Sequence, residues 1–271
     1  MSFDHVWQID PARTLLATGL STLALVPAGA LRAVLDRRRV GRERAAIKPT
    51  KFALSIAVYL LTASWMLGYA RPERMSSALV QVSTWGLLVG TTVELVCITV
   101  QAARGRRSHF NTASRIDSTI AGTMAVLAVL FIGMLLPLAW EVGQRPRPGA
   151  SASMIAGIVG GLVLTFVLGG LTGSGMSQAA LQASASGTRT LSPLAQRRAR
   201  THMQLAHFLA IHAMQALPIM GWAALAVGGQ AAVALLTASA ICYAAVTLLL
   251  LYRPALLPAW SMIVLPLTSR S

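Results

Sequence analysis

Charged residues are scarce in this sequence, and acidic ones are the scarcest. Only 11% of the 271 residues are charged, whereas about a quarter are charged in a typical soluble domain. Just 8 residues are acidic against 23 basic ones, so the net charge is +15. The basic residues fall in short loops between apolar runs. That pattern indicates membrane topology and argues against a surface that binds nucleic acid.

Cysteine is nearly absent as well. Cys97 and Cys242 are the only two, and both fall within apolar runs. We interpret them as free, small packing residues. The sequence has no CxxC or CxxCH motif, so neither a zinc ribbon nor a covalently attached c-type haem is indicated.

Long apolar runs fill most of the chain. The hydrophobic fraction is 55% and the mean hydropathy is +0.63, which predicts an all-α integral membrane protein with one domain over residues 1–271. We expect a bundle of seven transmembrane helices at about 14–34, 52–69, 78–103, 118–140, 154–172, 202–225 and 231–252. The tail at 254–266 is apolar but short and broken by proline, and we expect it to lie at the membrane interface.

A signal peptide is the alternative interpretation of the first apolar run, because Ala28-Gly29-Ala30 resembles a cleavage site. No basic segment precedes the run, however, and three arginines follow it at 37–39, which favours an uncleaved span. Of the 23 basic residues, 18 fall in loops on the same side as these arginines. This predicts a multi-pass protein of the bacterial inner membrane, with its N-terminus outside and its C-terminus in the cytoplasm.

Three local features refine this prediction. Pro137 is expected to kink the fourth span. Gly157 and Gly161 form a small-xxx-small pair suited to close helix packing. Residues 173–199 are rich in Ser, Ala, Gln and Gly and are expected to form a flexible cytoplasmic loop.

The sixth span carries polar residues that hydrocarbon would not tolerate without partners. At 100° per residue, Gln204, His207 and Gln215 share one face of the helix, and His212 lies at its edge. A polar stripe at this depth predicts a functional site. The third span supplies Glu94, and Gln101 falls on the same face.

Depth suggests how the two spans meet. Glu94 and His212 each lie about 15 Å from the basic edge of the membrane at 1.5 Å per residue. If the spans face each other, Glu94 pairs with His212 and Gln101 pairs with His207. Glu94 and His212 are therefore the predicted proton-handling or catalytic pair.

Further polar residues lie at the basic rim. Imidazole and carboxylate ligands suit transition metals, and imidazole is the usual axial ligand of haem b. The expected cofactor is thus haem b or a transition metal, and Arg104 would pair with a propionate or another anion. The predicted metal ligands are His109, His202, His207 and Asp117. The predicted cofactor-binding residues are Gln101, Arg104, His109, Asn111, His207 and Gln215.

Three motifs resemble an uncharacterised family of bacterial multi-pass membrane proteins. They are IKPTKF before the second span, QAARGRRSHFN after the third, and HFLAIHAMQALP in the sixth, where Ala210 replaces a usual glycine. The resemblance covers about residues 47–222. It implies a shared site, names no activity, and adds two residues, Ser108 and Phe110, to the candidates already given.

Four functions stay open on these grounds. The leading hypothesis is redox or proton chemistry at a haem b or metal site. A proton-coupled transporter or channel is the second. A zinc-dependent membrane hydrolase similar to alkaline ceramidases is the third, although the histidine spacing departs from that group. The fourth is a non-catalytic assembly or signalling subunit. Expected partners are the lipid bilayer, including anionic lipids, and either a second copy or a larger membrane complex.

Overall fold

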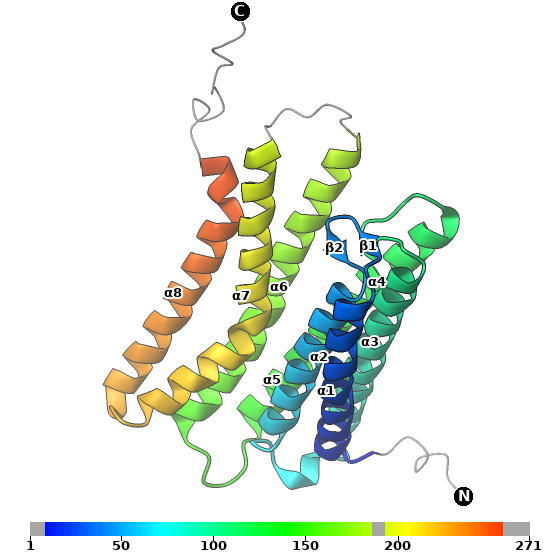
Figure 1. Cartoon of the computed structure of the whole chain (residues 1–271). Helices are drawn as coiled ribbons and strands as arrows, with labels where there is room; N and C mark the ends of the chain where they lie inside the picture. The colour runs from blue at the N-terminus through cyan, green and yellow to red at the C-terminus, as the bar shows by residue number, and fades with distance from the viewer. Residues whose placement is uncertain (1–8, 186–192, 257–271) are drawn as a thin grey trace, which may run out of the picture.

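The computed structural model describes residues 9–185 and 193–256. The described part is all-α, and 81% of its residues are helical; Figure 1 shows the arrangement. The helices are α1 (Pro11–Leu35), α2 (Ile47–Leu67), α3 (Ala78–Ala103), α4 (Arg115–Gly133), α5 (Leu135–Gln144), α6 (Ala152–Ala185), α7 (Pro193–Ala224) and α8 (Gly229–Leu256). A two-stranded hairpin, β1 (Arg39–Val40) and β2 (Glu43–Arg44), follows α1, and a short 3-10 helix, η2 (Pro72–Arg74), precedes α3.

Within the described residues, six helical segments are long and apolar enough to cross a membrane, which is consistent with a multi-pass α-helical membrane protein. They are α1, α2, α3, the α4–α5 pair, α6 up to Ala180, and α8 up to Tyr252. The helix α7 is as long as the others but is not among the six. Its histidines and glutamines lower its mean hydropathy below that of its neighbours.

The flexible loop expected at 173–199 is wrong over most of its length. The helix α6 continues to Ala185, and α7 already begins at Pro193. The reason is composition: the stretch from Met176 to Ala185 is polar enough to leave the membrane, yet it consists mainly of Ala, Gln, Leu and Met, which favour helix. Residues 186–192 lie outside the described part. The expected interfacial tail also lies outside the described part from residue 257 onward. Its first three residues, 254–256, form the end of α8.

Two prolines fall where the helices adapt. Pro49 lies in the first turn of α2, where a missing amide hydrogen costs nothing, so this helix begins at Ile47 rather than at the expected 52. The expected kink at Pro137 is confirmed: the proline cannot donate to the carbonyl of Gly133, and the fourth span breaks there into α4 and α5.

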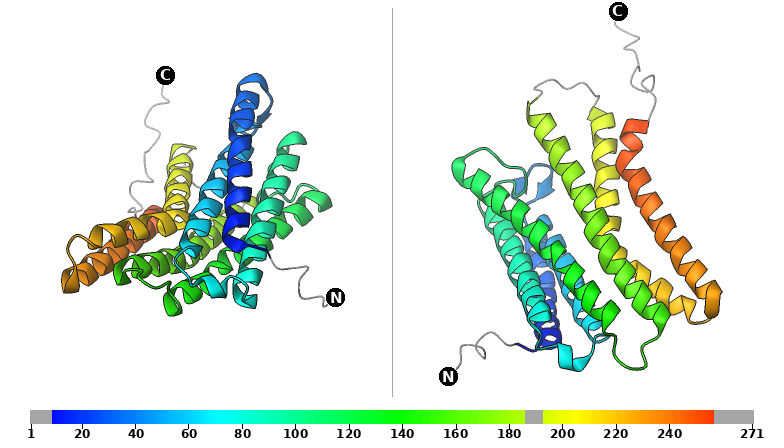
Figure 2. Two further views of the ribbon diagram at one scale, coloured as in Figure 1. Left: turned by 90° about the horizontal axis from the view of Figure 1, so that it is seen from below. Right: turned by 180° about the vertical axis from the view of Figure 1, so that it is seen from behind.

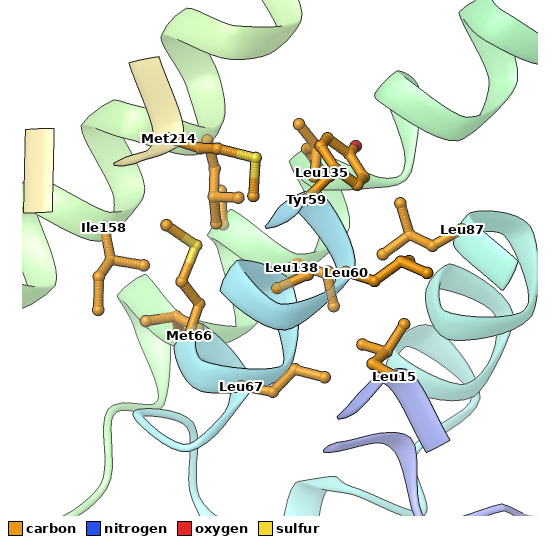
Figure 3. Close-up of a cluster of buried hydrophobic side chains, with 14 of the residues drawn as sticks. Leu15, Tyr59, Leu60, Met66, Leu67, Leu87, Leu135, Leu138, Ile158 and Met214 are labelled. Carbon is orange, nitrogen blue, oxygen red and sulfur yellow. The ribbon is translucent and has the colours of Figure 1, made fainter. Parts of the chain in front are cut away.

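The helices form two groups that meet through α5 and α6. Figure 2 shows α6, α7 and α8 side by side, with α1, α2 and α3 on the other side of the molecule. The shared core contains large buried side chains from six helices, α1, α2, α3, α5, α6 and α7, several of which are drawn in Figure 3. Examples are Leu60 of α2, Leu87 of α3, Leu135 of α5, Ile158 of α6 and Met214 of α7.

The two ends of the bundle differ in charge. The β1–β2 hairpin and the loop between α3 and α4 lie together at one end, which we call the basic end (Figure 1). The turns between α2 and α3 and between α5 and α6 lie at the opposite end. Of the basic residues in the described part, most belong to the first of these ends.

The contact between α6 and α7 is built on glycine, as the sequence predicted for Gly157 and Gly161. A Cβ at Gly157 would lie 2.7 Å from the carbonyl oxygen of Leu217, and one at Gly161 would lie 3.0 Å from that of Ala213. From α7, Gly221 approaches the carbonyl of Ser153 in the same way. Backbone atoms cannot move aside as side chains can, so only glycine permits this close crossing.

Gly157→Ala should therefore destabilise the protein by about 1–3 kcal/mol through overpacking against a helix backbone. Gly160→Ala is the matched control, because nothing lies within 4 Å of a Cβ built there. Unfolding of the purified protein by titration with sodium dodecyl sulfate, followed by circular dichroism, measures both variants. Equal stability of the two would show that the α6–α7 crossing is looser than described.

Candidate functional site

The buried carboxylate of Glu94 binds a histidine from the loop that follows its own helix. The loop between α3 and α4 folds back into the bundle, and His109 Nε2 lies 3.2 Å from Glu94 Oε1. On the other side of the ring, Nδ1 lies 3.3 Å from Lys48 Nζ in the first turn of α2. Phe52, one turn further along α2, packs edge-on against the imidazole. Lys48, His109 and Glu94 thus form one chain across two helices and a loop, which we call the relay chain.

The order of donors along the relay chain follows from the chemistry of lysine. An ammonium group has only hydrogens to give, so Nδ1 of His109 accepts from Lys48. A neutral imidazole with an accepting Nδ1 carries its hydrogen on Nε2 and donates it to Glu94. Ser108 Oγ, in the same loop, lies 3.1 Å from this Nδ1 and is within hydrogen-bond distance of it.

Glu94 keeps an unused oxygen in the protein interior. Only 5% of the residue is exposed. Within the described residues, its Oε2 and the Tyr59 hydroxyl are the buried side-chain atoms that lack a hydrogen-bond partner. Buried polar atoms are normally paired with protein or water. An unpaired carboxylate oxygen in an apolar bundle is therefore a position where a proton, a water molecule or a cation would bind favourably.

A second histidine, His207 of α7, binds within the other helix group. Its Nδ1 lies 2.9 Å from Thr172 Oγ1 on α6. The threonine hydroxyl also donates to the carbonyl of Leu168, so it accepts from the ring and fixes the hydrogen on Nδ1. The Nε2 atom of His207 is left as an acceptor.

A separate polar cluster anchors the loop that presents His109. Asp117 is fully buried, and its Oδ1 accepts from Gln101 Nε2 at 3.0 Å and from Arg104 Nη1 at 3.2 Å. Its Oδ2 accepts from Ser114 Oγ at 2.9 Å. Gln101 and Arg104 precede the loop and Ser114 ends it, so one carboxylate clamps both ends of the loop.

Within this clamp the loop is turned tightly. Asn111 donates to the carbonyl of Arg107 and accepts from the amide of Ala113. Phe110 has a φ of 54°, a left-handed conformation that is unusual for a bulky residue. At the same end, Arg38 donates to the carbonyl of Ala103 and to Asp36, and its hydrogen bond holds the pKa of Asp36 at about 2.

The predicted ladder between α3 and α7 is wrong in its pairs. Glu94 binds His109 instead of His212, and Gln101 binds Asp117 instead of His207. His212 makes its hydrogen bond within α7, to Gln215, whose amide donates to Thr62 Oγ1 of α2 at 3.1 Å. The physical reason is that depth along a helix does not fix the neighbour it faces, and a returning loop supplied closer partners.

The predicted metal ligands do not come together as one group. Asp117 is held by Arg104 and Ser114, while His207 binds Thr172. His202, part-buried on α7, forms no hydrogen bond with either of them in the described structure. Across residues 9–185 and 193–256, no three His, Cys, Asp or Glu side chains are placed to hold a metal ion. The donor set therefore does not fit the expected metal centre, and haem b stays a prediction from sequence alone.

Two participants were missed by sequence reasoning. Lys48 was assigned to topology, although its place in IKPTKF, one of the three singled-out motifs, was a usable signal. Thr172 gave no signal, because a single threonine at the end of an apolar run is ordinary.

Comparison with protein families, with curated proteins and with solved structures finds no match to this chain.

Asp117→Ala should release the clamp and expose the loop between α3 and α4. We expect faster trypsin cleavage after Arg104, Arg106 or Arg107 and a lower melting temperature, because the buried Gln101 amide and the Arg104 guanidinium lose their acceptor. Thr112→Ala, at an exposed position of the same loop, is the control. Mass spectrometry of the digest locates the cut. Unchanged cleavage in Asp117→Ala would mean that the loop is held by other contacts.

Proposed function

We propose that this protein is a proton-coupled transporter or channel of the bacterial inner membrane. It has seven spans, its N-terminus is outside, and α7 spans the membrane in addition to the six segments described above. Two observations support α7 as a span. It lies between α6 and α8 (Figure 1), and its polar side chains turn toward partners in the bundle, as His207 does toward Thr172. The orientation follows from the basic end, which the positive-inside rule assigns to the cytoplasm.

The observation that carries the function is the bond between His109 and Glu94 inside an apolar bundle, with Glu94 Oε2 unpaired. Ionisable groups at such depth are costly and are typical of ion and proton pathways. The Lys48 ammonium, supplied from the basic end, completes a continuous path from that end to the buried carboxylate.

A proton can pass along the relay chain in one concerted step. Lys48 gives a proton to Nδ1 of His109 while the hydrogen on Nε2 passes to Oε1 of Glu94. The ring ends as the other tautomer, and the positive charge of lysine and the negative charge of glutamate disappear together. Loss of a charge pair from a medium of low dielectric limits the cost of the transfer. Rotation of the neutral carboxyl group then carries the proton to the unpaired side of Glu94, where it leaves and a cation replaces it.

Single-cysteine labelling tests the topology. In a variant without Cys97 and Cys242, a cysteine at Ser76, in the turn between α2 and α3, should react with a membrane-impermeant maleimide added to intact cells. A cysteine at Thr112, in the loop between α3 and α4, should react only after the membrane is opened. The reverse labelling pattern would overturn the orientation, and labelling of both from outside would overturn the span count between them.

Glu94→Gln tests the proton site, because it keeps the shape of the side chain but removes the titrating carboxylate. Infrared difference spectra of the reconstituted protein between high and low pH should contain the carbonyl band of a protonated buried carboxyl group. This band should disappear in Glu94→Gln and shift in His109→Gln. Glu73→Gln, at an exposed position in the turn before α3 at the opposite end of the bundle, should leave it unchanged.

Proton flux tests the transport step itself. In proteoliposomes that contain a trapped pH-sensitive dye, we expect Glu94→Gln and His109→Gln to lower flux driven by a potassium diffusion potential at least tenfold. Glu73→Gln should retain it. A band that survives in Glu94→Gln contradicts the proton site. A lost band with unchanged flux contradicts transport and leaves Glu94 as a titrating group of some other reaction.

A further inference from the structure

The end of the molecule opposite the basic end holds a cluster of arginines. The positive-inside rule keeps this end poor in basic residues. Four of the arginines that are present nevertheless lie on just two turns, Arg71 and Arg74 before α3, and Arg145 and Arg147 before α6. Topology explains arginines at the basic end, but it does not explain their concentration here.

Backbone bonds lock the two turns together. Arg71 N donates to the carbonyl of Arg145 at 3.1 Å, and Arg147 N donates to that of Tyr69 at 2.8 Å. Ala70 and Pro146 pair between them as an isolated β-bridge. The guanidinium of Arg147 also stacks over the Tyr69 ring, 4.6 Å from its centroid. The arginines are therefore held on a joined backbone and not on separate mobile loops.

The cluster surrounds a cavity and carries excess positive charge. Arg71, Glu73, Arg74, Arg145 and Pro148 line a cavity of about 450 Å³. Beneath it, the fully buried Glu141 binds two guanidinium groups, Arg74 Nε at 2.6 Å and Arg145 Nη1 at 3.4 Å. One carboxylate cannot neutralise both. With Arg71 added and Glu73 counted against it, the lining stays positive.

The guanidinium groups have donors to spare. Arg74 uses Nε and Nη2 on Glu141, Arg145 uses Nη1 on the same carboxylate, and Arg71 uses Nε on the carbonyl of Pro146. In the described structure the remaining terminal nitrogens of Arg71 and Arg145 make no bond to protein. Glu141 also fixes the orientation of Arg74 and Arg145, which lowers the entropy lost when a ligand binds.

We propose that these residues, the arginine pocket, bind a phosphate-class anion, either a free phosphorylated solute or the phosphodiester of a lipid headgroup. Arginine forks match the oxygens of phosphate in a bidentate way. The cavity is larger than inorganic phosphate and falls in the size range of small-molecule sites. Its place at the ends of α2 and α5 puts it at the level of lipid headgroups. This binding is independent of the relay chain at the other end.

Calorimetric titration of the full-length protein in a neutral detergent tests the proposal. The probes are inorganic phosphate and a soluble short-chain phosphatidylglycerol, each compared with potassium chloride at equal ionic strength. We expect saturable binding of at least one probe. If inorganic phosphate binds, the free anion is sufficient. If phosphatidylglycerol binds and inorganic phosphate does not, the ligand is the lipid headgroup. If neither probe binds more than chloride does, the proposal is wrong.

Arg71→Gln should weaken that binding about tenfold or more, because it removes a charge-assisted hydrogen bond. Arg13→Gln is the control, since Arg13 lies at the same end, its side chain is 89% exposed, and it pairs only with Asp10. Arg71→Lys keeps the charge and should bind with intermediate affinity; it replaces Arg71→Gln if that variant does not purify as a monodisperse species. Equal weakening by Arg13→Gln, or none by either Arg71 variant, overturns the pocket.

Discussion

The structure depends on how a chain with so few acids buries three of them. Glu94, Asp117 and Glu141 are each at most 5% exposed, and each lies on a helix that is mainly apolar. A buried carboxylate without a partner would be prohibitively costly. Each one is therefore met by groups from an adjoining turn or loop, and this requirement draws those segments onto the ends of the bundle. Charge burial thus sets the shape of the loops as much as apolar packing sets the arrangement of the helices.

The three carboxylates differ in what meets them. Asp117 and Glu141 are each held by arginine, which stays charged at any physiological pH, so these pairs are fixed ties. Glu94 is met by the imidazole of His109 instead of an arginine, and one of its oxygens has no partner. The third carboxylate therefore differs from the two structural ones in the group that holds it and in its unpaired oxygen, and this difference is the basis of the proposed proton site.

The sequence predicted helices better than it predicted contacts. Residues 78–103 match α3 at both ends, and Gly157 and Gly161 lie where close packing was expected. Both follow from local rules, namely hydrophobic length and the need for a small side chain at a tight crossing. The depth expected for Glu94 is also a local inference, because it comes from counting residues along its own helix.

The partner of Glu94 does not follow from such local rules. Choosing between His212 and His109 required the path of an irregular loop, which hydrophobic periodicity does not encode. The predicted end of α6 was wrong for a related reason, because polarity marks where a helix leaves the membrane and not where the helix ends. Pair assignments drawn from depth alone therefore need an independent constraint on which helix faces are adjacent.

The loop between α3 and α4 offers such a constraint in its own backbone. Phe110 adopts a φ of 54°, which costs a β-carbon-bearing residue about 1 kcal/mol or more. Its side chain is 43% exposed, so core packing does not explain the conformation. The conformation persists because Asp117 clamps the loop at both ends, and its effect is to turn the preceding residue, His109, inward to Glu94. A loop free of that task would have relaxed, and the strain next to His109 is consistent with a loop built to present that ring.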